Sequence, residues 1–254
     1  MLRPLRLVRD VLRTFIGVVV VVVLTIVMGT YVIVLATFSP NSPQIKPLMR
    51  FWGFAFTKVA GVSWEVEGLE HLEPGRSYML LSNHISNLDP PFHMAIFCQV
   101  VSVRFLAKAE LFKIPLFAQA MRRVGIVETD RAAHAAAHRK INEQVAVVVD
   151  RGLSLIIYPE GTRSRDSELK PFKKGAFRIA IDNGLPVVPI ATCGLDEAWP
   201  PGSKLVRGGH ARLVIHEPIA TTDLGPADIA ELRDRVSIII GDTYERIRTT
   251  PQKR

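Results

Sequence analysis

The feature that most constrains this chain is a long uncharged segment near its amino terminus. Residues Phe15 to Phe38 contain no charged side chain. As one helix, the segment would be roughly 36 Å long, which exceeds the roughly 30 Å hydrocarbon core of a bilayer. It is too long for an ordinary signal peptide and lacks a small-residue cleavage site. We therefore predict a membrane helix.

A second segment follows the break at Ser39 to Pro43. Residues 45–62 mix Phe and Trp with Lys46, Arg50 and Lys58, which predicts an amphipathic helix at the membrane interface. We assign residues 1–62 to membrane-associating helices and 63–254 to a soluble domain. A full crossing and a hairpin that returns to the same side are both open, although four arginines before the first segment favour a cytoplasmic amino terminus: Arg3, Arg6, Arg9 and Arg13.

Composition narrows the class of partner. The net charge is +8, which suits anionic lipid or nucleic acid. The chain has no zinc-ligand spacing or RNA-binding signature, and its aromatic residues do not interleave with the basic ones, so we favour lipid over nucleic acid. The two isolated cysteines, Cys98 and Cys193, exclude a disulfide framework and do not indicate a metal site.

Strand and helix patterns alternate along the soluble domain. Apolar runs predict strands at 64–68, 78–81, 101–106, 125–127, 153–158, 186–191 and 211–215. Helices are predicted at 91–98, 117–123, 132–149 and 174–183, followed by a carboxy-terminal helix that places Ile229, Leu232, Val236, Ile240, Tyr244 and Ile247 on one face. This alternation predicts an α/β fold with three layers, in which a mixed sheet is flanked by helices.

The stretch from Leu80 to Pro90 carries the candidate chemistry. The apolar run before it ends abruptly in polar residues, and Pro90 follows Asp89, so a strand, a turn and a helix are predicted in that order. Across such a turn, the His84 imidazole and the Asp89 carboxylate are close enough to meet. A carboxylate on one ring nitrogen leaves the other nitrogen free to act as a base for a hydroxyl proton.

Other interpretations of the same residues stay open at this point. Asp89 before two prolines is also a plausible helix N-cap, and a single histidine beside a strand is often structural. A metal site built from His84, Asp89 and His93 is the weaker alternative, because His93 falls inside an apolar helix.

Three motifs carry a resemblance to a known family. Asn83-His84-x-Ser86-x-x-Asp89, Tyr158-Pro159-Glu160-Gly161-Thr162-Arg163-Ser164 and Val188-Pro189-Ile190 occur in that order. Together they resemble the first, third and fourth motifs of the glycerolipid acyltransferases of the 1-acyl-sn-glycerol-3-phosphate acyltransferase type, also called lysophosphatidic acid acyltransferases. The likeness covers roughly Trp64 to Pro218 and implies a glycerol-3-phosphate acyltransferase-like fold.

The resemblance implies a reaction. Members transfer an acyl group from acyl-CoA or acyl carrier protein to the free hydroxyl of 1-acyl-glycerol-3-phosphate, which forms phosphatidic acid. His84 would be the general base and Asp89 would orient it, with direct attack on the thioester, no cofactor and no metal. Ser86 would support the turn. Because these donors are cytosolic, the resemblance favours the hairpin, with the catalytic domain on the cytoplasmic face of a membrane, expected to be a bacterial inner membrane.

The resemblance also assigns substrate-binding residues. Arg163 is expected to bind the acceptor phosphate, and Glu160 to hold a substrate hydroxyl or to order Arg163. The full expected set is Lys108, Arg131, Glu160, Gly161, Thr162 and Arg163. Residues 125–131 resemble the second motif but depart from it at Glu128 and Thr129, where the family has an aromatic and an aliphatic residue.

That departure keeps alternative functions open. The same chemistry on another lysophospholipid or on an acylated amino-acid lipid is one. A membrane lipid-binding protein without turnover, and a hydrolase that uses the pair with water, are the others. Acyl-chain preference and oligomeric state are not readable from the sequence.

Overall fold

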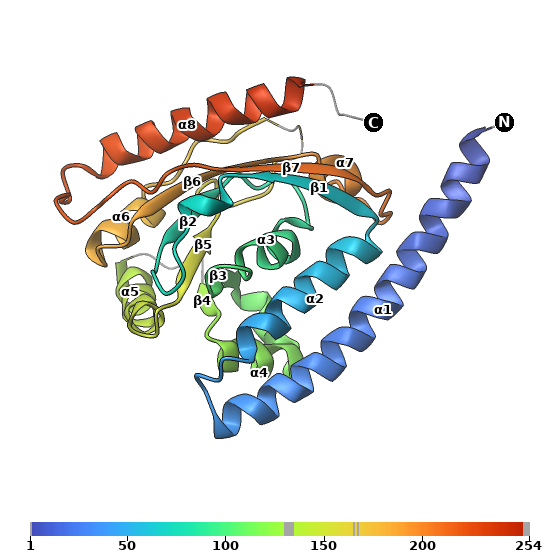
Figure 1. Cartoon of the computed structure of the whole chain (residues 1–254), viewed down its shortest axis with the longest axis horizontal. Coiled ribbons are helices and arrows are strands. Elements are labelled where there is room, and N and C mark those ends of the chain that lie inside the picture. Colours follow the sequence, from blue (N-terminus) through green and yellow to red (C-terminus); the bar gives the residue numbers. More distant parts are fainter. Residues whose placement is uncertain (1, 130–134, 165, 167, 251–254) are drawn as a thin grey trace.

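The computed structural model describes residues 2–129, 135–164, 166 and 168–250. Within them, seven strands form one sheet in the order β1-β7-β6-β2-β5-β3-β4 (Figure 1). The strands are β1 (Val62–Glu67), β2 (Met79–Ser82), β3 (Val103–Lys108), β4 (Val127–Thr129), β5 (Ser154–Ile157), β6 (Val187–Cys193) and β7 (Gly209–Ile215). All neighbouring strands pair in parallel except β6 and β7, so the sheet is mixed as predicted.

The central strands are β2 and β5, and every residue of both is buried. Continuous apolar runs are typical of parallel strands covered on both faces. Leu81 pairs with Ile157, so the two strands end side by side at the same edge of the sheet. The loops that follow them, which carry the first and third motifs, therefore begin next to each other.

Helices cover both faces of the sheet. In Figure 1, α8 lies above it, while α2 and α3 lie below; α6 contacts both α5 and α8. The helices are α1 (Leu2–Phe38), α2 (Ile45–Val59), α3 (Asp89–Phe97), α4 (Pro115–Val124), α5 (Ala135–Asp150), α6 (Gly175–Asp182), α7 (Leu195–Ala198) and α8 (Ile229–Thr249), with 3-10 turns η1 (Leu69–His71) and η2 (Ala109–Lys113).

The predicted elements are present with shifted ends, and the start of the helix predicted at 132–149 lies outside the described residues. The extended segment predicted at 125–127 lies at Val127–Thr129 instead, because Gly125 ends α4 in a left-handed conformation with φ 88°. On α8, Ile229 at the start is partly exposed. The other five residues predicted on one face are buried: Leu232, Val236, Ile240, Tyr244 and Ile247.

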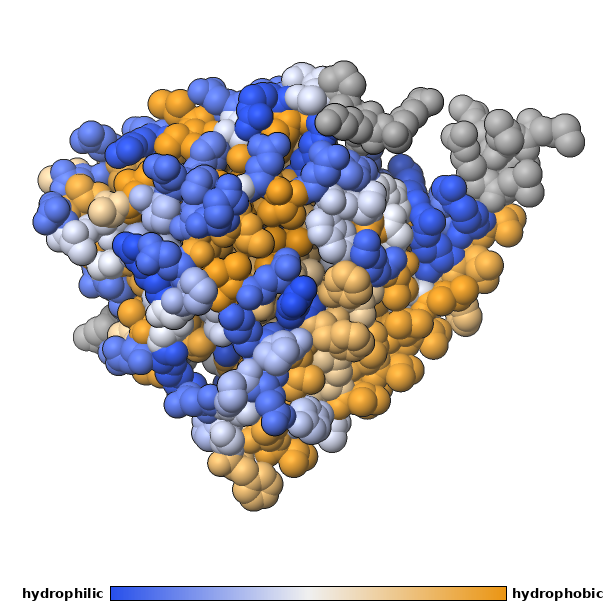
Figure 2. Space-filling view, viewed as in Figure 1, coloured by the Kyte–Doolittle hydropathy of each residue, from blue (hydrophilic) through white to orange (hydrophobic). Residues whose placement is uncertain are grey.

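The amino-terminal helices form an antiparallel pair beside the domain (Figure 1). Of the described helices, α1 alone has the length and composition to cross a membrane, over Leu7–Phe38. Its outward side carries exposed apolar residues along this whole span, among them Phe15, Val19, Val23 and Val27. We call this side the apolar face of α1, and Figure 2 shows it as a continuous hydrophobic stripe along one edge of the molecule.

Helix α2 packs tightly against α3 through Gly53. A Cβ atom at this position would lie 2.3 Å from the Pro91 carbonyl oxygen and 2.8 Å from the Ala95 nitrogen. These neighbours are backbone atoms, which cannot move aside without displacing α3. Gly53 is therefore the residue that lets α2 join the core of the soluble domain.

We expect Gly53→Ala to lower the free energy of unfolding by about 2 kcal/mol, because the added methyl group overpacks this contact. The control is Gly241→Ala in α8, where a Cβ would meet Leu169 at an ordinary 3.8 Å. That change should be neutral or stabilising by up to about 1 kcal/mol, since alanine favours helices. Denaturant unfolding in detergent measures both. Equal stabilities of the two variants would contradict the close packing.

Candidate active site

His84 and Asp89 are brought into contact by the turn between β2 and α3. The Nδ1 atom of His84 lies 2.6 Å from Oδ2 of Asp89. The same oxygen accepts hydrogen bonds from the backbone nitrogens of Ile85 at 2.8 Å and Ser86 at 2.9 Å. The Asp89 side chain is fully buried, whereas that of His84 is 13% exposed. The imidazole is thus partly accessible, while the carboxylate that contacts it is not.

The carboxylate does not act as a helix cap. Its hydrogen bonds go backward to the loop, and no side-chain cap bond is formed at the start of α3. Ser86 supports the same loop, because its hydroxyl donates to the Trp199 carbonyl at 2.8 Å and accepts from the Leu88 nitrogen at 3.2 Å. The hydroxyl and the backbone N–H of Ser86 are both used in hydrogen bonds that hold the turn.

Glu160 ties the third motif to the first. One carboxylate oxygen accepts from the His84 backbone nitrogen at 2.7 Å, and the other accepts from the Lys170 backbone nitrogen at 3.1 Å. Glu160 is predicted to hold a substrate hydroxyl or to order Arg163; among the described residues, its carboxylate bonds to these two backbone nitrogens and forms no ion pair with Arg163. Its carboxylate faces backbone N–H groups because the parallel strands place the two loops against each other.

Gly161 and its neighbours complete this loop. Gly161 has φ 76°, and a Cβ there would come within 2.8 Å of the Lys173 ammonium nitrogen. Thr162 and Arg163 are exposed. The Lys170 ammonium reaches the Arg163 carbonyl at 3.0 Å and the Thr162 hydroxyl at 3.5 Å. The loop therefore holds two further cations close to the predicted arginine.

A cavity of about 1220 Å³ opens beside the pair. Its polar lining residues include His84, Lys108, Glu110, Thr162, Arg163 and Lys170. Its apolar lining comes from α1, α2, α3, α4 and β3, with Met28, Val32, Trp52, Met94, Phe105 and Met121 among the residues. Apolar side chains suit a hydrocarbon chain, and the cations suit an anion.

Comparison with known proteins identifies the domain that carries these residues. The family model described as Acyltransferase matches residues 63–192, just over half of the chain. The chain belongs to the acyltransferase family. The resemblance drawn from three motifs is thereby confirmed at the level of the family.

Named relatives of this acyltransferase point in one direction. A 1-acyl-sn-glycerol-3-phosphate acyltransferase from Limnanthes douglasii is 34% identical over 77% of the chain and 66% of its own length. One of the same name from Pseudomonas aeruginosa is 29% identical over 89% and 88%. The chain thus spans just under two thirds of the plant relative and most of the bacterial one.

A solved structure shares the whole fold of this acyltransferase. The crystal structure of the 1-acyl-sn-glycerophosphate (LPA) acyltransferase from Thermotoga maritima superposes with a TM-score of 0.84 and is 26% identical. The match covers 98% of the present chain and all of the other. It therefore includes the amino-terminal helices as well as the α/β domain.

The sequence indicates two further residues: Arg131 as a substrate-binding residue and His93 only as part of the metal alternative. Arg131 lies outside the described residues. His93, which the metal alternative requires, has both ring nitrogens occupied: Nδ1 lies 3.0 Å from the Tyr158 hydroxyl and Nε2 lies 3.0 Å from the Thr192 hydroxyl. Within the described part of the chain, no cluster of three His, Cys, Asp or Glu groups is arranged for a metal.

The site residues predicted from the sequence leave out Tyr158 and Lys170. Tyr158 stacks on the His84 ring, and Lys170 bonds to the Arg163 carbonyl. Tyr158 could have been found from the sequence, because it is an aromatic residue directly after a buried strand. Lys170 could not, because its position depends on the path of the loop after the motif.

Burial changes the charge of Glu160. It raises the pKa of this carboxyl to about 7, although the hydrogen bonds from the His84 and Lys170 backbones oppose the change. The folded protein therefore binds this proton more tightly than the unfolded chain does. The contribution of Glu160 to stability is present below about pH 4.5 and is lost as pH rises through about 7.

We predict that Glu160→Gln removes this pH dependence. Relative to the variant, the wild-type free energy of unfolding should fall by about 2 kcal/mol between about pH 5 and pH 8. The variant should also be less stable at low pH, because one backbone N–H would face an amide NH₂. Denaturant unfolding across this range is the measurement. Parallel pH curves for the two proteins would show that Glu160 keeps its ordinary titration.

Proposed function

We propose that the chain transfers an acyl group from an acyl thioester to the free hydroxyl of 1-acyl-glycerol-3-phosphate and so forms phosphatidic acid. The observation that carries the proposal is a solvent-reaching imidazole, bonded to a buried carboxylate, in the lining of a cavity that also carries cations and many apolar side chains. The names of the relatives agree with it. Membership of the acyltransferase family agrees as well.

His84 would act as the general base. Asp89 on Nδ1 selects the tautomer whose Nε2 lone pair is free, and Nε2 takes the proton of the acceptor hydroxyl. The hydroxyl oxygen then forms a bond to the thioester carbonyl carbon. The carbon–sulfur bond breaks, and the departing thiolate receives the proton from the imidazolium. Atoms and charge balance without an acyl-enzyme, a metal or a cofactor.

The acceptor phosphate would bind at the cationic side of the cavity. Arg163 supplies a planar guanidinium for two phosphate oxygens, and Lys108 and Lys170 add point charges. Glu128, which kept other acceptors open, is paired with Arg122 at 3.8 Å and is not among the residues that line the cavity. It therefore provides no argument for a different head group.

The donor would be acyl-CoA or acyl carrier protein. Both are acidic, and a chain with a net charge of +8 attracts either of them. The apolar part of the cavity would hold a fatty acyl chain. The partners expected are therefore two lipid-linked substrates and the bilayer.

The packing of α1 supports a helix that lies in one leaflet. Thr14, near one end, accepts a hydrogen bond from the Val206 nitrogen at 2.9 Å. Thr25 accepts one from Trp52 at 3.0 Å, and Tyr31 donates to Gln44 at 2.7 Å. A helix that contacts the domain and α2 along its length, with an apolar face outward, is suited to partial burial in lipid. We infer a hairpin on the cytoplasmic face of a bacterial inner membrane.

We expect His84→Ala to lower acyl transfer by about 10³-fold, because the acceptor hydroxyl loses its base. Asp89→Asn should lower it by at least about 10²-fold, because the amide favours the wrong tautomer. The measurement is product formation by purified protein in detergent, from labelled acyl-CoA and a panel of lysolipids. The control is His210→Ala, which should keep wild-type activity. His210 lies on β7, and its ring bonds to Ser63 on β1.

Several outcomes would contradict the proposal. Formation of phosphatidic acid by His84→Ala at the wild-type rate would show that His84 is not the general base. Free fatty acid without acylated acceptor would indicate a hydrolase. Preference for another lysolipid would change the acceptor but keep the chemistry.

Cysteine labelling tests the hairpin. Native Cys98 and Cys193 are both buried, so an introduced thiol is the reactive one. We expect Arg9→Cys on α1 and Arg178→Cys on α6 to react with an impermeant maleimide from the same, cytoplasmic side of membrane vesicles. Sealed vesicles of opposite orientation provide the control. Labelling of the two positions from opposite sides would show that α1 crosses the membrane.

A further inference from the structure

An aromatic ring packs against one face of the His84 imidazole. The ring of Tyr158 is stacked on the His84 imidazole, with centroids 4.0 Å apart and planes inclined by 13°. Tyr158 directly follows β5, and His84 follows β2, so the parallel pairing of these strands brings the rings together. His84 is thus held at its edge by Asp89 and on its face by Tyr158.

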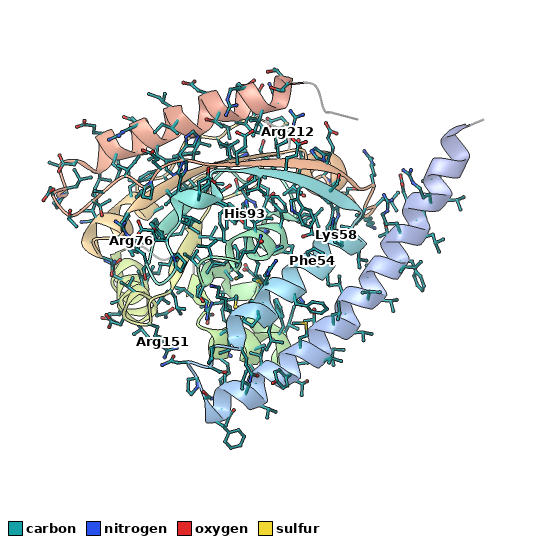
Figure 3. The ribbon with its side chains drawn as sticks, in the orientation of Figure 1. Phe54, Lys58, Arg76, His93, Arg151 and Arg212 are labelled. Atoms are coloured by element: carbon teal, nitrogen blue, oxygen red, sulfur yellow. The ribbon has the colours of Figure 1, made fainter. Side chains whose placement is uncertain are left out.

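Tyr158 is itself fixed by a buried histidine. Its hydroxyl lies 3.0 Å from Nδ1 of His93, whose Nε2 lies 3.0 Å from the Thr192 hydroxyl. Thr192 Oγ1 in turn lies 3.4 Å from the Ser82 hydroxyl. Figure 3 labels His93 close to the centre of the molecule, beneath the sheet, and its side chain has no exposed surface. This series of hydrogen bonds runs from Tyr158, beside His84, into the core.

The hydrogen bonds that link Tyr158, His93 and Thr192 are donated in one direction. Burial lowers the pKa of His93 to about 4, and the nearby Asp89 offsets this only in part, so the ring is neutral at pH 7. Burial raises the pKa of Tyr158 above its usual range, so the phenol keeps its proton. Among the described residues, the phenol has His93 as its hydrogen-bond partner. Tyr158 therefore donates to Nδ1, and Nε2–H donates to Thr192.

We propose that Tyr158 and His93 form a positioning pair for His84. The hydrogen bond between them fixes the Tyr158 ring, and that ring keeps the imidazole in the orientation in which Nδ1 meets Asp89 and Nε2 faces the cavity. The stacked ring also stabilises the imidazolium that forms when His84 takes a proton, because its face is electron-rich. This inference rests on the proposed role of His84 as the base.

Other charged groups surround His84. Asp89 contacts the ring from α3, and Glu160 bonds the backbone of His84 from the loop after β5. Arg163, Lys108 and Lys170 line the same cavity. Substitution at Tyr158 leaves each of these groups in the chain. Because burial raises the pKa of Glu160 to about 7, the pH profile is read together with the titration of the His84 ring itself.

Tyr158→Leu removes the ring. We expect kcat to fall by about 10- to 100-fold with KM changed less than about twofold, because the base loses its orientation and not its substrate contacts. The acidic limb of the pH profile of kcat/KM should move to lower pH by roughly half a unit or more, because the imidazolium loses its stacking partner.

Two milder variants test the hydrogen bond. Tyr158→Phe keeps the ring but loses the hydroxyl, and His93→Phe removes its acceptor. Each should lower kcat by about three- to tenfold with the acidic limb unchanged. The double variant should lose no more than either single variant, because one broken bond accounts for both.

The matched control is Tyr78→Phe, which removes another tyrosine hydroxyl and keeps the ring. This hydroxyl accepts a hydrogen bond from the Glu73 nitrogen at 3.1 Å. It should lower the melting temperature and leave kcat and the pH profile unchanged. Wild-type kcat and pH profile in Tyr158→Leu would overturn the pair, as would losses that multiply in the double variant. Melting curves of all variants identify loss of folding.

A second measurement separates this inference from the proposed function. If wild-type protein fails to transfer acyl groups, the proposed function is wrong, but the pair remains testable. The His84 ring resonance, assigned by its loss in His84→Ala, is followed by NMR against pH without substrate. A lower titration midpoint in Tyr158→Leu supports the stacked ring, and an unchanged midpoint overturns it.

Discussion

One carboxylate oxygen organises the site. Oδ2 of Asp89 accepts from the His84 ring and from two backbone nitrogens of the loop before it. Pro90 and Pro91 explain why it turns backward, because neither offers an N–H group at the start of α3. The next nitrogen, of Phe92, is bonded to the Leu88 carbonyl. With no helix donor to cap, Oδ2 takes its hydrogen bonds from the turn, while Oδ1 is buried without a hydrogen-bond partner among the described residues. The turn presents the imidazole.

The sheet supplies the second constraint. Because β2 and β5 are parallel neighbours, the loops that follow them start side by side, and Glu160 joins them through backbone hydrogen bonds. The same adjacency stacks Tyr158 on His84. The imidazole of His84 on one loop and the cations Arg163 and Lys170 on the other thereby line a common cavity.

Helix α1 lies between this cavity and the outside of the molecule. Its outward side is the apolar face, while Thr25, Met28, Gly29 and Val32 line the cavity on its other side. In the proposed function, the apolar face would border membrane hydrocarbon. A lysolipid that entered along this helix would keep its acyl chain out of water, and the hydrophobic effect would favour that route.

The sequence by itself determined the local features of this acyltransferase. The contact between His84 and Asp89 spans five positions, the buried strands are continuous apolar runs, and α1 is set by its uncharged length, so each follows from residues near one another in the chain. Only the tertiary structure decided the order of the strands, the partners of Glu160, and the stacking of Tyr158 between His84 and His93. Glu160 and Arg163 are close in sequence, yet the carboxylate turns to the backbone of His84. The direction of a side chain at a strand end depends on the neighbouring strand, and that neighbour is chosen by packing across the whole sheet.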